Sequence, residues 1–200
     1  MNADDKIIEA EFFLQKIIEN YNEFPFVEYY FHAFVTSTRS IADYLLEDYN
    51  VKYDLKIPDD ERNFRKKFKE KAYTLGDAKC PQCGFLDERA LEFDKWYDRQ
   101  ITKITSDNIG SELWNKRNFI IHRGGGQIED FSQKIARDMG IDIPKGVAIQ
   151  IQSHDGEPNR SLPTTTIYLE SMAYVDLKEV CEKFLSLMKE MVLEAHRQFL

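Results

Sequence analysis

The chain has 200 residues, 42% of them apolar and 13% aromatic, which is enough to build a packed core and excludes a largely disordered protein. Its 35 acidic residues outnumber its 27 basic ones, and the net charge of −8 excludes a protein that coats nucleic acid through bulk positive charge. No segment approaches the roughly 18 apolar residues of a membrane span, and the N-terminus lacks the pattern of a signal peptide. The length predicts one domain over residues 1–200, with an insertion. Three cysteines are too few for a disulfide framework, so we expect a reducing, cytoplasmic setting.

Apolar residues spaced by three and four predict amphipathic helices over residues 4–22 and 25–49. The second of these is rich in aromatic residues and carries Glu28, His32 and Arg39 on its polar side. Two interpretations of that side are open. It could border a functional cleft, or it could face solvent and hold ordinary ion pairs, as such surfaces usually do.

The composition changes over residues 51–84, where no clean helical period continues. We interpret this stretch as an insertion between two core helices, with a short helix over 61–73. It contains a basic run made of six residues: Arg62, Arg65, Lys66, Lys67, Lys69 and Lys71. Arg65, Lys66 and Lys67 are candidates for a local phosphate-binding surface, although the run is equally typical of a solvated helix face paired with acids.

Helical spacing returns over residues 86–104. Ser106 and Asp107 then form an N-cap for a further helix, which we expect to end at Arg123, just before three successive glycines. Glycine accepts the left-handed conformation that commonly terminates a helix.

Alternating apolar and polar residues at 147–151 and 165–169 predict a β-hairpin over about 147–169. The last helix is expected over 176–197, with Asp176 and Glu179 placed as in a capping box. We therefore expect a mostly α fold, an antiparallel bundle of about five core helices with the 51–84 insertion and a small hairpin before the final helix.

The end of the fourth core helix gathers the chemically richest residues of the chain, namely Lys116, Arg117, Asn118, His122 and Arg123. Asn118 and His122 are four residues apart and share a helix face. Arg117 and His122 are five apart, about 140° around an ideal helix. They converge only if the last turn loosens or if a second subunit closes the groove between them.

These residue types suit metal-free cleavage of RNA. A histidine can exchange a proton near neutral pH, and an arginine matches the charge and shape of a phosphodiester. The RNA 2′-hydroxyl supplies the nucleophile, so the protein needs only proton transfer and charge stabilisation. The stretch contains no carboxylate, which argues against a metal-dependent nuclease built there. Lys116 and Arg123 are further candidates for substrate binding.

The segment from Arg117 to His122 resembles the Arg, polar residue, three others, His motif of the HEPN superfamily (higher eukaryotes and prokaryotes nucleotide-binding domain). The segment Arg39–Leu45 also resembles part of the second helix of such domains. The resemblance leaves the insertion and the hairpin unexplained. It covers the helical parts of the chain: roughly 4–50, 86–123 and 175–197.

The resemblance implies a helical bundle that forms a homodimer, with two motifs facing a shared cleft. Many members are metal-independent endoribonucleases of toxin–antitoxin, phage-defence or RNA-processing systems, so Arg117 and His122 would be catalytic, Asn118 auxiliary, RNA the substrate and an antitoxin a possible partner. Other members are inactive modules that bind RNA, a nucleotide or a protein, and this is the alternative function. In a third interpretation, Arg117 pairs with a helical acid and His122 caps the helix C-terminus.

Cys80 and Cys83 resemble half of a zinc knuckle, because thiolates at this spacing can ligate one tetrahedral metal. A complete site needs about four ligands. Cys181 lies on the apolar side of the last predicted helix and is expected in the core. The remaining ligands would come from a second copy of the pair or from histidines: His32, His154 and His196. The alternative is an ordinary turn with two reduced cysteines, and the proposed catalysis needs no cofactor.

Overall fold

A computed structural model describes residues 2–21, 23, 26–77, 88–123, 128–130, 165–169 and 173–199. For 116–123 and for most of the strand residues, the description covers the backbone. The described part is predominantly helical, which confirms the expected mostly α bundle.

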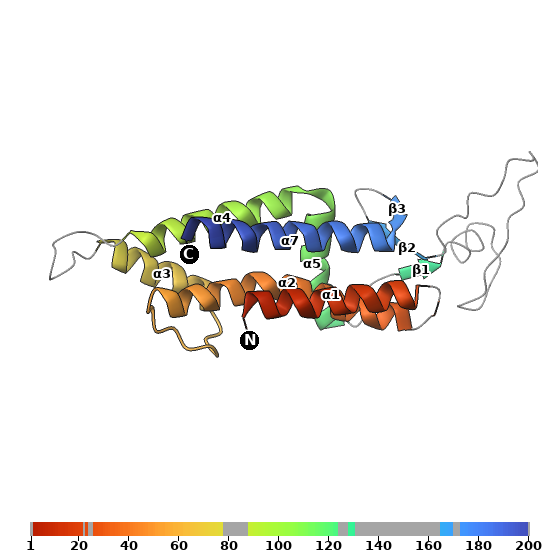
Figure 1. Ribbon diagram of the computed structural model, residues 1–200, viewed down its shortest axis with the longest axis horizontal. Helices are drawn as coiled ribbons and strands as arrows, with labels where there is room; N and C mark the ends of the chain where they lie inside the picture. Colours follow the sequence, from red (N-terminus) through yellow and green to blue (C-terminus); the bar gives the residue numbers. More distant parts are fainter. Residues whose placement is uncertain are drawn as a thin grey trace, which may run out of the picture.

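The four longest helices of the described residues lie along the long axis of the molecule in two layers (Figure 1). α1 (Ala3–Glu19) and α2 (Phe26–Lys52) form one antiparallel pair, and α4 (Arg89–Ser106) and α7 (Leu177–Phe199) form the other. The predicted helices at 4–22, 25–49, 86–104 and 176–197 match these four to within a few residues. Their buried apolar faces meet between the layers and form one continuous core.

α1 and α7 are joined where one ends and the other begins. Asp176 Oδ1 accepts a hydrogen bond from the backbone N–H of Glu179 at 3.0 Å, which confirms Asp176 as the N-cap of α7. Its other oxygen, Oδ2, accepts from the hydroxyl of Tyr21 at 2.6 Å. The start of the last helix is thereby fixed to the end of the first.

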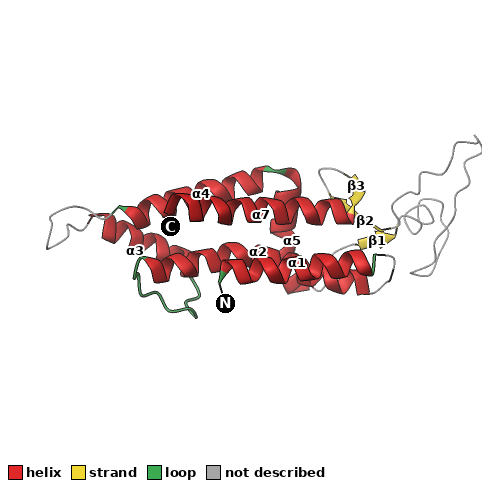
Figure 2. Ribbon diagram, in the orientation of Figure 1, coloured by secondary structure: helices red, strands yellow, loops and turns green. Residues whose placement is uncertain are grey.

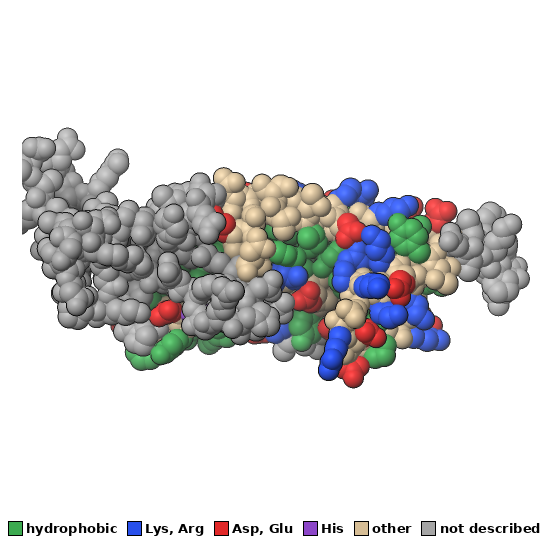
Figure 3. All heavy atoms as spheres, turned by 180° about the vertical axis from the view of Figure 1, so that it is seen from behind, with side chains coloured by type: hydrophobic (Ala, Val, Ile, Leu, Met, Phe, Trp, Pro, Cys, Tyr) green, Lys and Arg blue, Asp and Glu red, His purple; other side chains and the backbone are tan. Residues whose placement is uncertain are grey.

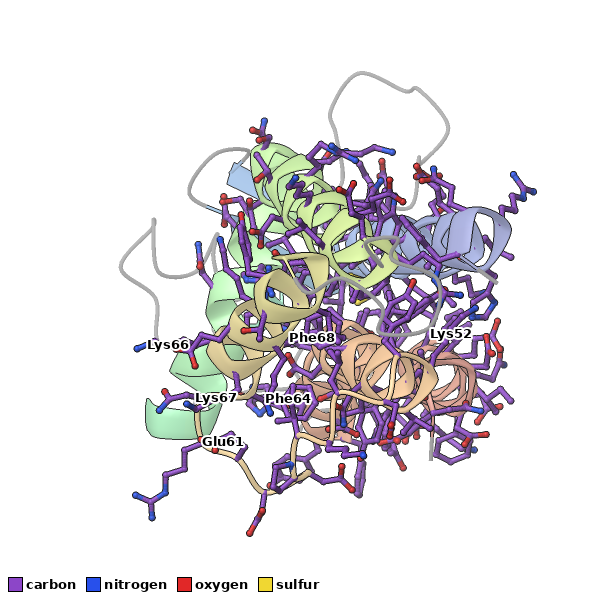
Figure 4. All side chains as sticks on the ribbon, turned by 90° about the vertical axis from the view of Figure 1, so that its left-hand side faces the viewer. Lys52, Glu61, Phe64, Lys66, Lys67 and Phe68 are labelled. Carbon is purple, nitrogen blue, oxygen red and sulfur yellow. The ribbon has the colours of Figure 1, made fainter. Side chains whose placement is uncertain are left out.

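α3 (Phe64–Asp77) lies in the stretch interpreted as an insertion, and it starts and ends later than the expected 61–73. Its Phe68 is fully buried, with 5.7 Å between its ring centroid and that of Phe93 of α4. Figure 4 shows Phe64 and Phe68 directed toward α2, while Lys66 and Lys67 point away from the bundle. The insertion therefore contributes side chains to the core.

The loop between α2 and α3 is held by the buried side chain of Asn50. Asn50 Nδ2 donates to the carbonyl of Ile57 at 2.9 Å, and Asn50 Oδ1 accepts from the N–H of the same residue at 3.1 Å. Asp54 and Lys56 adopt positive φ angles of 50° and 55° in this loop. Leu55 and Ile57 are buried, so the loop adds to the core as well.

α5 (Asn108–Arg123) crosses the bundle between its two layers (Figure 1). It begins after Asp107 and ends at Arg123, as the sequence predicts. Ile109 and Leu113 are buried, which anchors the first two turns of α5 in the core.

The strands lie at the end of the bundle where α7 begins (Figure 2). β1 (Ile128–Asp130), β2 (Thr165–Leu169) and β3 (Ala173–Asp176) form an antiparallel sheet in the order β1-β2-β3. In its register, Ile167 is opposite Ile128 on one side and Val175 on the other. The strand predicted at 165–169 is confirmed, whereas residues 147–151, expected as its partner, lie outside the described residues. The sequence pattern missed β1 and β3.

Candidate active site on helix α5

The motif occupies the last two turns of α5, and the helical backbone continues without interruption through Arg123. Positions 117 and 122 therefore lie about 140° apart around the helix axis. Loosening of the last turn was one of two expected ways to bring these residues together. That expectation is wrong, because the backbone stays helical through Arg123. The other route, closure by a second subunit, stays a prediction. The side chains of all five motif candidates lie outside the described side chains: Lys116, Arg117, Asn118, His122 and Arg123.

Asp107 fixes the start of the motif helix. Its Oδ1 accepts from the N–H groups of Ile109 and Gly110, both at 3.0 Å, and its Oδ2 lies 2.7 Å from Nζ of Lys183 on α7. Burial raises the pKa of Asp107, but the hydrogen bonds from Lys183, Gly110 and Ile109 outweigh it and hold that pKa below its ordinary value. The cap thus binds α5 to α7 through a charged contact.

Gly110 allows a sharp change of direction between α4 and α5. A Cβ atom on Gly110 would lie 2.2 Å from the carbonyl oxygen of Ile104, far inside contact distance. Only glycine permits this close approach of the two helices, so Gly110 helps to set the direction in which α5 crosses the bundle.

Trp114 of α5 contacts the polar side of α2 one helical turn before the motif. Arg39 Cζ lies 3.5 Å from the Trp114 ring centroid, and Arg39 Nη1 lies 3.1 Å from Oδ1 of Asp43. Trp114 precedes Arg117 by three residues and Asn118 by four, so these three positions share one side of α5. At Arg39 the polar side of α2 holds the expected ion pair, and it also contacts α5 before the motif. That this side borders a functional cleft stays a prediction.

His32, on the same side of α2, lies in a different place. It lines a pocket of about 360 Å³ between α1 and α2, together with Ser37 and Lys6. Burial lowers the pKa of His32, and Glu28 acts in the opposite direction. Of the three polar residues singled out on this helix, Arg39 contacts a described side chain of α5.

The basic run on α3 divides into residues with different partners. Arg65 forms ion pairs with Asp94, which is 1% exposed, and with Asp98 at 2.6 Å. Lys67 pairs with its neighbour Glu70 at 3.1 Å, whereas Lys66 is exposed and forms no ion pair with the described side chains. Of the three candidates, Arg65 thus joins α3 to α4, and Lys67 pairs within its own helix. Lys66 is available to a ligand.

A surface groove of about 610 Å³ lies between α3, the turn before it, α2 and α4. Figure 3 shows Lys and Arg side chains gathered over this end of the molecule, with acidic side chains between them. The groove is lined by eight residues: Asp43, Arg62, Asn63, Phe64, Arg65, Lys66, Lys69 and Asp98. Lys67 is not among them.

The sequence did not reveal the acidic residues that line this groove, Asp43 and Asp98. Asp98 is four residues from the buried Asp94, which indicated a shared helix face, but nothing in the local sequence connected either of them to Arg65. Arg62 and Lys69 belonged to the recognised basic run, and only the fold shows that they line a groove.

The zinc hypothesis stays a prediction, since Cys80, Cys83 and His154 lie outside the described residues. Cys181 is fully buried in α7, where burial raises the pKa of its thiol, and this confirms its place in the core. His196 Nε2 lies 4.0 Å from a carboxylate oxygen of Asp4. In the part of the chain that the structure describes, no group of three or more His, Cys, Asp or Glu side chains is placed to hold a metal ion.

Within the described helices, none combines the length and apolar character that crossing a bilayer requires. No protein family, curated protein or solved structure matches this chain. Its function is therefore inferred from its own residues.

Proposed function

We propose that this protein is a metal-independent endoribonuclease that acts as a homodimer. His122 transfers protons, Arg117 binds the scissile phosphate and Asn118 orients these groups, with Lys116 and Arg123 binding the adjacent RNA backbone. The observation that supports this most is the position of the motif at the C-terminal end of a continuous helix, which Asp107 and Trp114 fix to the bundle.

The proposed reaction is transesterification at phosphorus. The 2′-hydroxyl loses its proton to a neutral imidazole and attacks the neighbouring phosphorus, while the bond from phosphorus to the 5′-oxygen breaks. The imidazolium of His122 formed in this way then donates its proton to that oxygen, which leaves a 2′,3′-cyclic phosphate and a 5′-hydroxyl. Arg117 compensates the additional negative charge of the transition state.

A dimer follows from the geometry of α5 under this proposal. Because positions 117 and 122 point about 140° apart on one helix, the two cannot readily reach the same phosphate from one chain. A two-fold axis beside the helix end would bring the Arg117 of one protomer toward the His122 of the other. Each dimer would then contain two composite sites.

The activity is tested by incubating the purified protein with mixed RNA in EDTA. We expect cleavage that leaves 2′,3′-cyclic phosphate ends and survives chelation, and we expect His122→Ala and Arg117→Ala each to lower it at least about 100-fold. His196→Ala is the matched control, since His196 lies near the N-terminus of α1 and contacts Asp4. Intact RNA with a folded, dimeric protein would support the inactive binding module instead.

Mixing two inactive variants tests the composite site. In a heterodimer of Arg117→Ala and His122→Ala, one composite site keeps both groups and the other has neither. In an equal mixture with random subunit exchange, about half of the dimers are heterodimers with one intact site. The mixture would therefore have about a quarter of the wild-type activity. No restoration, despite proven subunit exchange, would show that each site is built from one chain.

A further inference from the structure

The groove beside α3 has a charge opposite to that of the chain. Four cationic side chains line it, against the two carboxylates of Asp43 and Asp98, so its lining carries a net charge of about +2. The whole chain carries −8. The pockets that contain His32 and His196 show no such excess of Lys and Arg over Asp and Glu. A local positive groove on an acidic protein favours a polyanion at that place.

The cations of the groove are not equivalent. Arg65 is held by Asp94 and Asp98, and its guanidinium carbon lies 5.1 Å from the Tyr97 ring centroid, so it fastens α3 to α4. Lys69 lies 3.5 Å from Asp98, at a site half exposed to solvent. Arg62 and Lys66 are exposed and form no ion pair with described side chains, so they can contact a ligand without giving up an ion pair in that part of the chain.

The groove is connected to the motif helix through two side chains of α2, Asp43 and Arg39. Asp43 lines the groove and is also the partner of Arg39, which stacks on Trp114 of α5. Seen along the bundle axis in Figure 4, the far end of α5 lies on the same side of the molecule as Lys66 and Lys67. A strand bound in the groove and directed toward the motif would pass the Asp43–Arg39 pair.

We propose that this groove binds the phosphates of the RNA strand that flanks the cleaved bond, with Arg62 and Lys66 as the main contacts and Lys69 as a third. This inference rests on the proposed function for the direction of the strand. It moves the RNA contacts from Arg65 and Lys67, whose charges are paired, to the more available cations of the groove.

Binding is measured with a fluorescent single-stranded RNA in EDTA, using the His122→Ala protein so that the probe stays intact. The groove triple variant replaces Arg62, Lys66 and Lys69 with Gln in that background. The control triple replaces Lys16, Lys56 and Lys178 with Gln, each paired with a nearby acid and none of them lining the groove, and it changes the net charge equally. Melting curves establish that both triples are folded.

Three lost phosphate contacts would weaken binding on the order of 100-fold at 0.1 M salt and would flatten the slope of log K against log salt by about 2. The control triple should bind like its parent. If the groove triple does not fold, Lys66→Gln alone should weaken binding about fivefold and flatten the slope by about 0.7.

Equal affinity and equal slope for the groove and control variants would overturn the inference, whether or not the wild-type protein cuts RNA. An RNA that binds in the groove but is never cut by the wild-type protein would refute the proposed function and leave the groove assignment intact. An affinity lowered equally by both triples would show a diffuse charge effect and would also overturn the groove assignment.

Discussion

Arg39 of α2 stacks on Trp114 of α5, with 3.5 Å between the guanidinium carbon and the ring centroid. The same guanidinium pairs with Asp43, which lies one turn further along α2. The contact joins a long helix of the bundle to the helix that carries the motif, one turn before Arg117 and Asn118. It therefore controls how accurately the end of α5 is placed relative to α2.

Replacing Arg39 with Ala should lower the free energy of unfolding by about 1 kcal/mol, because a partly buried cation–π contact is lost. We expect misplacement of α5 to lower the cleavage rate constant kcat about tenfold, with KM changing less. A tenfold loss corresponds to an activation free energy raised by about 1.4 kcal/mol. Arg39→Lys keeps the charge but not the planar stacking, so its kcat and its free energy of unfolding should lie between those of the wild type and of Arg39→Ala.

Asp43→Asn is the control for this contact, because it removes the ion pair with Arg39 and leaves Arg39 stacked on the Trp114 ring. It should retain most of the activity. An Arg39→Ala protein that cleaves RNA at the wild-type rate would show that the stacking does not position the motif.

Asp107 provides a pH-dependent test of the cap on the motif helix. Asp107→Ala should lower the free energy of unfolding at pH 7 by about 1 kcal/mol, because two backbone N–H groups lose their acceptor. In Asp107→Asn the amide oxygen would still cap the helix. The folded protein holds the pKa of Asp107 below the ordinary value of 3.8, so its charge-dependent contribution is full above that pH and is lost as the pH falls through the lower, folded pKa.

Urea unfolding of the wild type and of Asp107→Asn between pH 7 and pH 2 measures this contribution. The difference in free energy between the two should be constant above about pH 5 and should shrink below about pH 4. A difference that does not vary with pH would mean that the contact with Lys183 contributes no charge-dependent stability.

The long helices were predictable because each buries a continuous apolar face, and such a face imposes its period on the sequence. Both ends of α5 were predictable from local sequence signals, since Asp107 marks its start and the glycines after Arg123 mark its end. α3 was only partly predicted. Its core-facing positions Phe64, Phe68 and Ala72 recur every four residues, but the basic side chains between them obscured that period.

The parts that were not predictable depend on contacts between residues far apart in the chain. Arg65 reads as one cation in a basic run, and only the position of α4 shows that Asp94 and Asp98 hold it. The strands β1 and β3 are three and four residues long, too short for alternation to be distinctive, and their pairing with β2 joins distant segments. The motif itself was visible in the sequence, because its residues lie within one helix.

Arg65 should behave as a structural residue. Asp94 is buried, so Arg65→Ala leaves a buried carboxylate without its partner, and the free energy of unfolding should fall by about 3 kcal/mol or more. Lys67→Ala removes an exposed pair with Glu70 and should leave the melting temperature nearly unchanged. Thermal unfolding of the two variants distinguishes these outcomes, and equal melting temperatures would contradict the assignment of Arg65 to the core contact.

Lys56 offers a way to stabilise the loop that leads into α3. Its φ angle of 55° is a left-handed conformation that costs a residue with a Cβ atom about 1 kcal/mol or more, and its pairing with Asp54 at 3.4 Å is exposed and contributes little. Lys56→Gly should therefore raise the free energy of unfolding by about 0.5 kcal/mol, the strain relief less the greater freedom of glycine in the unfolded chain. Lys56→Ala removes the same charge but keeps the Cβ atom, so it should give no gain. If urea unfolding placed the glycine variant at or below the alanine variant, backbone strain at this position would be refuted as the cause.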